Sequence, residues 1–307
     1  RGSATLDRLS LPWLASALAL GPVAPAPSGA IWPTARFTDA PTLPFAGILA
    51  VKASVVDLGL GLQGRDAGFT LNAAPAGLRL SRLDMRLGEA RLRGELGLDR
   101  QGGLASLSGD AAIENLPVTA LLGAPFTAGR LAAKLRFGTS GESVAGLLAN
   151  LGGAGDVSIE GLAIDGADPG APGRLAQRVL RTDEPLAAQR WQPLLAEELG
   201  RAPLAAASPV AAPGALVGGA LRLSPLRIEA GPGLWQGTAT LDLRGLALDM
   251  RGALQAKEAP RGWTGAPPTL GLGWAGRLGR IVREADSAPL VGGLATNVLA
   301  RELDRVD

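Results

Sequence analysis

Glycine and proline are dense along the whole chain, and this limits its fold more than any other feature. The 307 residues include 44 glycines and 23 prolines, together more than a fifth of the chain. In a helix interior each glycine costs about 1 kcal/mol relative to alanine and each proline about 3 kcal/mol. A mostly helical fold is therefore excluded. Many short strands separated by frequent turns suit this composition, and we expect a mainly β protein.

Three residue types are missing, and their absence narrows the chemistry. The chain has no histidine, cysteine or tyrosine. It therefore cannot build a Ser-His-Asp triad, a cysteine nucleophile or an ordinary zinc, copper or haem site. Three lysines and the carboxylates remain, but GESVAG (141–146) spaces its glycines wrongly for a nucleophile elbow. We expect no catalytic residue, no cofactor and no metal, and a protein that is not an enzyme.

The charges are balanced. Thirty basic residues face 28 acidic ones, giving a net charge of +2. No run of basic residues is interleaved with aromatics, so nucleic acid is not an expected partner. No segment reaches the ~18 to 20 apolar residues of a membrane-spanning helix. Because RGSATLDRLSL already reads as structured sequence, we expect the chain to be part of a longer protein.

Alternating apolar residues predict strands, and some strand segments recur. Within residues 77–99 the apolar residues change phase at Gly88–Glu89, which predicts a hairpin. LRLSRLDM (78–85) recurs as LRLSPLRI (221–228), and FAGILAVKA (45–53) is echoed by FTAGRLAAKL (126–135). Irregular spacing between the copies argues against a propeller or a tight solenoid. We expect a long antiparallel sheet extended by repeated meanders.

Helical spacing interrupts this pattern in three places. Residues 140–153 and 286–306 each carry one apolar stripe, and residues 172–200 read as two helices broken near Pro185 or near Pro193. Residues 207–219 look like a linker of small residues. The expected divisions are a repeated β segment over 1–168, a helical insertion and linker over 169–213, a closing β segment over 214–285 and a C-terminal amphipathic helix over 286–307.

The glycine-rich stretch LGGAGDVSIEGLAIDG (151–166) invites three interpretations. A dinucleotide site would need a strand before the glycines and a helix after them, and here the order is reversed. A calcium-binding repeat would need many stacked copies, and this one lacks a residue. We therefore expect Gly152–Gly155 to be a hinge between a helix ending at Leu151 and a strand, with a phase change near Gly161. The aspartates Asp165 and Asp168 are expected in solvated turns, and the pairs Asp183–Glu184 and Glu197–Glu198 are expected to face solvent.

Together these segments resemble the AsmA family of bacterial envelope proteins. The likeness rests on four short motifs: G-x-L at Gly129–Leu131, G-x-S at Gly141–Ser143, L-x-G-x-G at Leu151–Gly155 and G-x-D at Gly166–Asp168. The closing segment from GALRLSPLRIEAG onward is also similar. The resemblance implies a long twisted sheet curled into an open groove at the periplasmic face of the inner membrane, with an anchor outside this fragment. It implies that phospholipid acyl chains slide along the groove towards the outer membrane.

Three pairs of alternating residues are candidates for the groove lining. These are Leu96 and Leu98, Val157 and Ile159, and Leu241 and Leu243. We expect them to share one apolar face while arginines and aspartates cover the other; alternatively, the same face packs on the helices at 140–153 and 172–200. The main hypothesis is a lipid-binding or lipid-transfer module that supports outer-membrane integrity. A structural scaffold that regulates outer-membrane protein assembly through contacts with envelope proteins is the alternative, and a secreted repeat adhesin is a weaker third.

Overall fold

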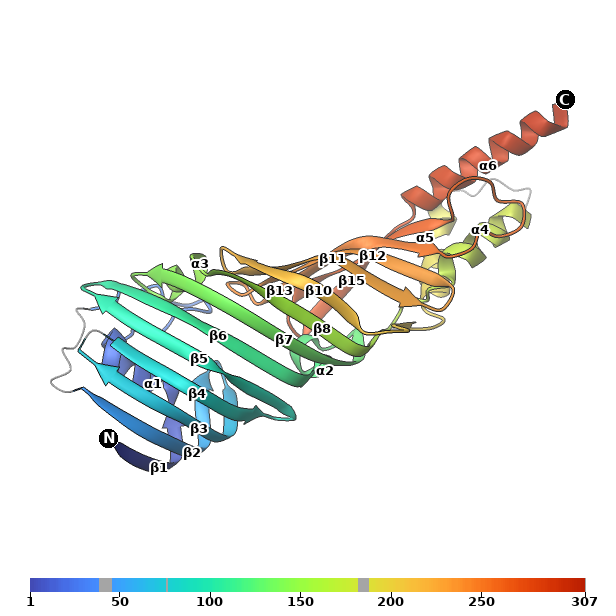
Figure 1. Ribbon diagram of the computed structural model, residues 1–307. Helices are drawn as coiled ribbons and strands as arrows, with labels where there is room; N and C mark the ends of the chain where they lie inside the picture. The colour runs from blue at the N-terminus through green and yellow to red at the C-terminus, as the bar shows by residue number, and fades with distance from the viewer. Residues whose placement is uncertain (39–45, 76, 182–187, 307) are drawn as a thin grey trace.

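A single long sheet forms the body of the protein. The computed structural model describes residues 1–38, 46–75, 77–181 and 188–306. Strands make up 56% of the chain and helices 18%, and the sheet curls into an open groove, so the predicted mainly β fold is confirmed. Figure 1 shows the strands laid obliquely side by side from the N-terminus towards the helices near the C-terminus.

Fifteen strands belong to this sheet, and all but β9 follow one another across it in chain order. The first eight are β1 (Gly2–Ser10), β2 (Gly47–Gly59), β3 (Leu62–Ala74), β4 (Gly77–Leu87), β5 (Ala90–Gln101), β6 (Leu104–Pro117), β7 (Phe126–Gly141) and β8 (Gly152–Ile164). The others are β9 (Leu204–Ala205), β10 (Val210–Val217), β11 (Ala220–Ala230), β12 (Gly233–Asp242), β13 (Ala247–Ala256), β14 (Thr269–Arg277) and β15 (Arg280–Asp286).

One strand pair departs from the expected antiparallel order. β1 runs parallel to β2, with Gly2 opposite Leu49 and Ser10 opposite Asp57. All other pairs in the described chain are antiparallel. A parallel pair needs a crossover connection, because the chain must return to the same end of the strands at which β1 began before β2 can start. The segment between the two strands contains α1 (Leu11–Ala15) and a π-helical turn, η1 (Ser16–Leu20).

The expected linker at 207–219 was wrong. Residues Val210–Val217 form β10, which pairs with β8 on one side and with β11 on the other. The closing β segment therefore begins at Val210 rather than at residue 214. Small residues and Pro213 gave this segment the composition of a linker. Its alternate residues are nevertheless buried, and β8 and β11 supply ladder partners that no local signal reveals. Through β10 the two halves of the chain form one sheet.

The recurring segments occupy equivalent strands. LRLSRLDM lies in β4 and LRLSPLRI in β11. Each of these strands contains a β-bulge, one residue more than the strand it pairs with, and the bulge falls at the same position of the repeated segment. In β4 the register shifts between Leu80 and Leu83, and in β11 between Leu223 and Leu226. Such bulges bend a strand and increase its local twist. The predicted hairpin between β4 and β5 is confirmed, with Gly88 at φ +59.

In the described part of the chain, six α-helices accompany the sheet besides η1. α2 (Val118–Leu122) and α3 (Val144–Ala149) lie between strands, and α6 (Ala288–Val306) confirms the predicted C-terminal helix. α4 (Ala171–Arg181) and α5 (Ala188–Leu199) confirm the pair expected over 172–200. Residues 182–187, which include Pro185 and the pair Asp183–Glu184, lie outside the described chain. Pro193 stays inside α5.

The hinge expected at Gly152–Gly155 was wrong. α3 ends at Ala149, with Asn150 as its C-cap, and all four residues already belong to β8. A Cβ atom at Gly155 would overlap the carbonyl oxygen of Lys134 on β7, so these glycines allow adjacent backbones to approach closely in a bent part of the sheet. The phase change near Gly161 is confirmed: Val157 is buried before it and Leu162 and Ile164 after it, and Gly161 has φ +60.

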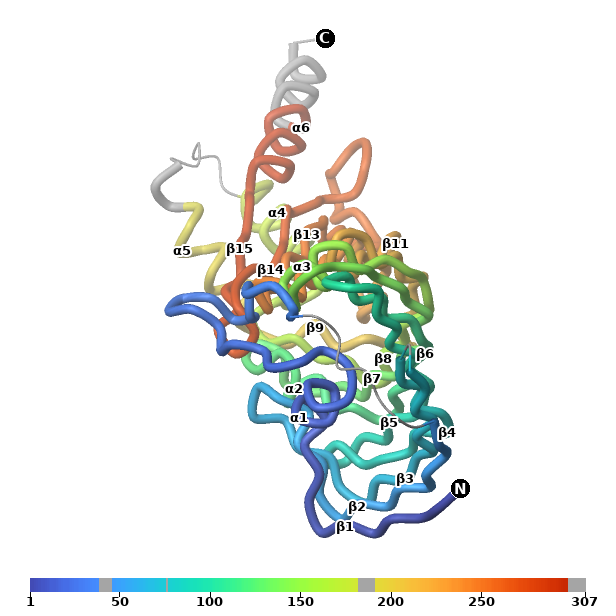
Figure 2. The backbone as a smooth tube through the Cα atoms, turned by 90° about the vertical axis from the view of Figure 1, so that its left-hand side faces the viewer, coloured from blue at the N-terminus to red at the C-terminus, as the bar shows by residue number. Residues whose placement is uncertain are grey.

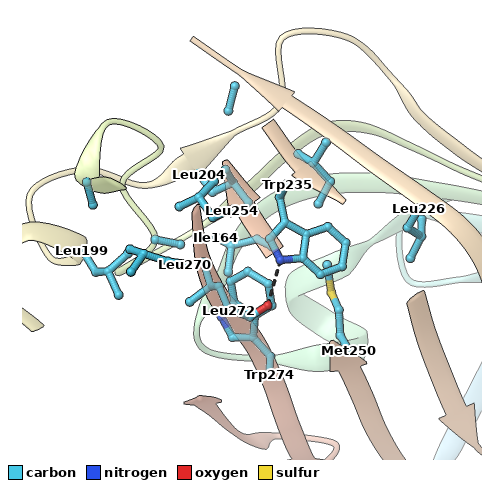
Figure 3. Packing of buried hydrophobic residues seen from close by; sticks show 14 of the residues in the cluster. Ile164, Leu199, Leu204, Leu226, Trp235, Met250, Leu254, Leu270, Leu272 and Trp274 are labelled. Carbon is cyan, nitrogen blue, oxygen red and sulfur yellow. Dashed lines mark hydrogen bonds between the residues drawn. The ribbon is translucent and has the colours of Figure 1, made fainter. Parts of the chain in front are cut away.

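Two apolar clusters pack against the curled sheet. The N-terminal cluster joins β2–β6 to residues of α1, η1 and α3, and includes Val56, Met85 and Leu98. The C-terminal cluster joins β8–β15 to α2, α4, α5 and α6. Figure 3 shows its centre, where the indole nitrogen of Trp235 donates a hydrogen bond of 2.8 Å to the carbonyl oxygen of Leu272. Trp235 and Trp274 are fully buried there.

Candidate functional site

One face of the sheet is apolar from its first strand to its last. Residues that pair directly across a sheet share a face, and the ladder can be followed through strand after strand without a charged residue. This row consists of Gly2, Leu49, Leu71, Leu80, Leu96, Gly109, Phe137, Gly153, Leu216, Leu221, Leu241, Leu248, Gly276 and Ile281. We call the side of the sheet that carries this row the apolar face.

The opposite face carries the charges. One residue away from the apolar row, Glu95 pairs with Asp110, Asp110 with Arg136, and Arg222 with Thr240. Surface ion pairs add to this pattern. Arg91 donates to both carboxylate oxygens of Asp84, at 2.8 and 2.5 Å, and these hydrogen bonds lower the pKa of Asp84. The sheet is therefore amphipathic across its whole width, as predicted.

The middle of the apolar face is the part that neither cluster covers. In the middle of β5, β6 and β7, five of its side chains are half-buried and belong to neither the N-terminal nor the C-terminal cluster. We call this section the central floor; it consists of Leu96, Ala111, Ile113, Leu135 and Phe137. Next to it, Gly153 and Gly155 of β8 add backbone rather than side chains. The floor is thus apolar, accessible and recessed at its β8 side.

The surface is hollowed over the same strands. An open hollow of about 1050 Å³ lies against β6, β7 and β8. Its lining contains consecutive residues of each strand, among them Leu135 and Phe137 of the apolar alternation and Lys134, Arg136 and Asp156 of the charged one. None of its lining residues belongs to either cluster. The hollow therefore lies on strands β6, β7 and β8 at residues outside both clusters, while α2 and α3 contact β6 and β7 elsewhere.

Five of the six predicted groove residues share the apolar face. Leu96 and Leu241 lie in the row itself, and Leu98, Val157 and Ile159 alternate with row positions on β5 and β8. Leu243 lies beyond β12, which ends at Asp242, in the turn to β13. The alternative expectation, that this face packs inside the protein rather than lining a groove, also applies in part. Leu98 belongs to the N-terminal cluster, and Ile159 packs against the C-terminal one.

A segment that we call the strap, residues 11–38, covers the apolar face before the central floor. Its first half, α1 and η1, contacts β2, β4 and β5. Its second half reaches α3, where the amide of Phe37 donates to the carbonyl of Glu142 at 2.7 Å. The indole of Trp32 donates to the carbonyl of Leu243 at 3.0 Å. Figure 2 shows the strap in blue on the inner side of the curled sheet.

A buried ionic cluster corrects two expectations about acidic residues. Asp168 and Glu198 were expected to face solvent, but they are only 6% and 2% exposed. Arg174 bridges them, with Nη2 at 2.8 Å from Asp168 and Nε at 2.7 Å from Glu198. Partial burial opposes the charge of Arg174, and the two carboxylates outweigh that effect and raise its pKa. Glu197 is exposed, as expected.

The role of this cluster is to attach helices to the sheet. Asp168 follows β8 and also accepts a hydrogen bond from the amide of Gly170 at 2.7 Å, whereas Glu198 lies at the end of α5. Burying a carboxylate in a low-dielectric interior is costly unless an opposite charge is close. Arg174 on α4 supplies that charge for both acids. Across the described residues, no group of three or more aspartates and glutamates is arranged to hold a metal ion.

Sequence reasoning missed most of the central floor. Phe137 and Leu135 alternate on β7, and Ala111 and Ile113 on β6, with the same period as the residues chosen. What distinguishes them is exposure, which depends on where the strap and helices end. Three of the six tryptophans, Trp191, Trp235 and Trp274, are buried packing residues of the C-terminal cluster, whereas Trp13 is 64% exposed.

The motifs of the AsmA resemblance fall at definite places. They lie in β7, at the N-cap of α3, at the start of β8 and in the turn that follows β8. No helix in the described part of the chain combines enough length and apolar character to span a bilayer. Comparisons of the chain with protein-family models, curated proteins and solved structures find no significant match.

Proposed function

We propose that the protein binds phospholipid acyl chains on its apolar face and serves lipid transfer between the membranes of a bacterial envelope, without catalysing a reaction. One observation carries the proposal: the central floor is a half-buried apolar surface, outside both packed clusters, in the middle of a face that has no charged residue in its row from Leu49 to Ile281. Soluble proteins rarely leave such a surface open unless something binds to it.

An acyl chain fits this surface physically. Burying each CH₂ group contributes about 0.8 kcal/mol, and this gain requires no specific hydrogen bond. The floor offers no charged side chain to fix a headgroup or to stop a chain at one position. A chain held in this way can move along the row, because neighbouring positions are chemically similar. The resemblance to the AsmA family supports the same assignment and the same location at the periplasmic face of the inner membrane.

The strap provides a second line of support. Its leucines, which lie in α1 and η1, and Phe37 show that the apolar face accepts the apolar side chains of a segment laid across its N-terminal half. An acyl chain would make the same kind of contact further along the face, where the strap is absent.

Lipid extraction from the purified protein, followed by mass spectrometry, tests the proposal. We expect phospholipid to co-purify. A photo-crosslinking amino acid placed at Phe137 should label acyl chains, whereas the matched control at Arg136, one residue away on the charged face, should not. Absence of phospholipid together with equal labelling at both positions would overturn the proposal.

A scaffold that acts through protein contacts is the second candidate. It is favoured by β1, which has a strand partner on one side only within the described sheet. An open strand edge can accept a strand from another protein. This function predicts that the substitution Thr5→Pro in β1 impairs outer-membrane protein assembly, while Phe137→Asp has no effect on it. The lipid proposal predicts the opposite order of severity.

A further inference from the structure

The strap makes two kinds of contact with the molecule. From residue 11 to residue 23 it packs apolar side chains on the sheet: Leu14, Leu18, Leu20 and Val23 are half-buried against the N-terminal cluster. Near its end, Phe37 is 6% exposed and belongs to the same cluster as Leu98 and Leu147. The strap therefore lies along the apolar face as a bound apolar chain would.

Beneath the strap, the apolar face continues without a change in chemistry. Leu71 and Leu80 precede Leu96 in the same ladder row, and all three are leucines. Leu71 belongs to the N-terminal cluster and Leu96 to the central floor. The boundary between the covered and the uncovered parts of the face is thus set by the strap and not by the sheet.

Polar contacts at the far end hold the strap in place. Arg100 binds the carbonyls of Thr38 at 2.6 Å and Leu20 at 3.4 Å, and its guanidinium lies 5.2 Å from the centre of the Phe37 ring. Besides the Phe37 amide bond to Glu142, the carbonyl of Pro33 accepts from the amide of Ala145 at 2.9 Å. Between η1 and these contacts, residues 21–37 form no helix or strand.

The C-terminal cluster is closed in a different way. Its centre consists of side chains that belong to strands and long helices, such as Trp235, Trp274 and Leu290, which are fully buried. Opening that cluster would require several elements to move. Opening the N-terminal part requires only that the two short helical turns α1 and η1 and the irregular residues 21–37 leave their place, and short or irregular segments open at the lowest free energy.

We propose that the strap is an internal occupant of a second, covered section of the lipid groove, and that a phospholipid acyl chain binds there when the strap lifts. The covered section comprises Leu71, Leu80, Met85 and Leu98. This inference rests on the proposed function. It adds that the open groove is longer than the central floor and that its length is regulated by the chain itself.

A reversible lock tests the competition between strap and lipid. The chain has no cysteine, so Arg36→Cys with Glu142→Cys introduces the only pair; their side chains now form an ion pair at 3.2 Å, next to the Phe37–Glu142 backbone hydrogen bond. Binding of a fluorescent phospholipid in detergent micelles would be measured with the disulfide oxidised and after its reduction. We expect the oxidised form to bind lipid at the central floor alone and reduction to add binding at the covered section, whose apparent Kd is roughly ten times its intrinsic value if the strap is open a tenth of the time. The single variant Arg36→Cys should not respond to reductant.

A second measurement shows at which residues the acyl chain binds. A photo-crosslinker at Leu71 should label acyl chains in a Phe37→Ser variant at least several-fold more than in the wild type, while a crosslinker at Phe137 labels both equally. Equal labelling at Leu71 in both proteins, or binding that is the same in the locked and reduced forms, would overturn the inference. Loss of labelling at Phe137 as well would instead overturn the proposed function, so the two failures are distinguishable.

Discussion

The backbone amide of Gly279 donates a hydrogen bond of 3.1 Å to the carbonyl of Leu122. Gly279 lies in the turn between β14 and β15, near the end of the sheet, and Leu122 ends α2 between β6 and β7. Nearby, the rings of Phe126 and Trp274 lie 6.4 Å apart, and Arg283 donates to the carbonyl of Gly166. These contacts bring the last strands back against the middle of the sheet. The C-terminal half is therefore filled, and the central floor is a section of the apolar face that belongs to neither cluster.

Lipid binding should depend on one face of β7. We predict that Leu135→Asn lowers the affinity for a fluorescent phospholipid about tenfold or more, because it places an amide in a surface that provides only apolar contact. Arg136→Asn is the matched control one residue away on the charged face, and we expect less than a twofold change. Circular dichroism should show both variants folded. A larger loss for Arg136→Asn than for Leu135→Asn would contradict an apolar site.

Gly252 packs so closely against Trp235 that this position should tolerate no side chain. A Cβ atom at Gly252 would lie 2.6 Å from Cζ2 of Trp235 and would overlap the carbonyl oxygen of Gln236. We predict that Gly252→Ala lowers the free energy of unfolding by about 1–3 kcal/mol, as overpacking in a core does. Urea denaturation would measure it.

Gly47 is the control for this substitution, since nothing lies within 4 Å of a Cβ built there. Gly47→Ala should change the free energy of unfolding by less than about 0.5 kcal/mol. Equal effects of the two substitutions would mean that the Trp235 contact is not tight.

The ionic cluster should matter more than its surface neighbours. Glu198→Gln removes the charge that partners Arg174 and Arg201, which contact it at 2.7 and 2.9 Å. We predict a loss of about 1–3 kcal/mol in the free energy of unfolding, below the value for a fully buried pair because the arginines are partly exposed. Glu197→Gln, on an exposed side chain at the adjacent position, should cost under about 0.5 kcal/mol. Thermal denaturation that ranks the two variants in the opposite order would contradict a structural role for Glu198.

Acid should weaken the surface pairs of the charged face. Hydrogen bonds from Arg91 lower the pKa of Asp84. At Asp242, burial raises the pKa, but hydrogen bonds from the side chain and amide of Arg244 outweigh it and lower the pKa overall. A carboxylate whose pKa is lower in the folded state stabilises the fold above its unfolded pKa of about 3.9, and this stabilisation is lost as the pH falls through the folded value.

The measurement is the melting temperature between pH 7 and pH 2.5. We predict that the double variant Asp84→Asn with Asp242→Asn melts slightly below the wild type at pH 7, and that the difference disappears at the acid end of the range. A difference that grows on acidification would show that the carboxylates are not held in their charged form by these arginines.

Local sequence determined the strands, their turns and the two faces of the sheet. Two-residue alternation is a property of each strand alone, so Leu96, Val157 and Leu241 could be assigned to one face before their neighbours were known. Glycines with positive φ, such as Gly88 and Gly161, marked turns and phase changes for the same reason. The recurrence of one segment in β4 and β11 also followed from residues close in the chain.

Only the tertiary structure decided which part of the apolar face remains open. β10 could not be recognised because its residues are small and its strand character comes from ladder bonds to β8 and β11. The parallel pairing of β1 with β2, and hence the strap, depends on partners 47 residues away, as between Gly2 and Leu49. Asp168 and Glu198 became buried because Arg174 meets both of them. Alternation fixes the direction in which a side chain points, but exposure depends on what packs above it, and that is a long-range property that no local pattern contains.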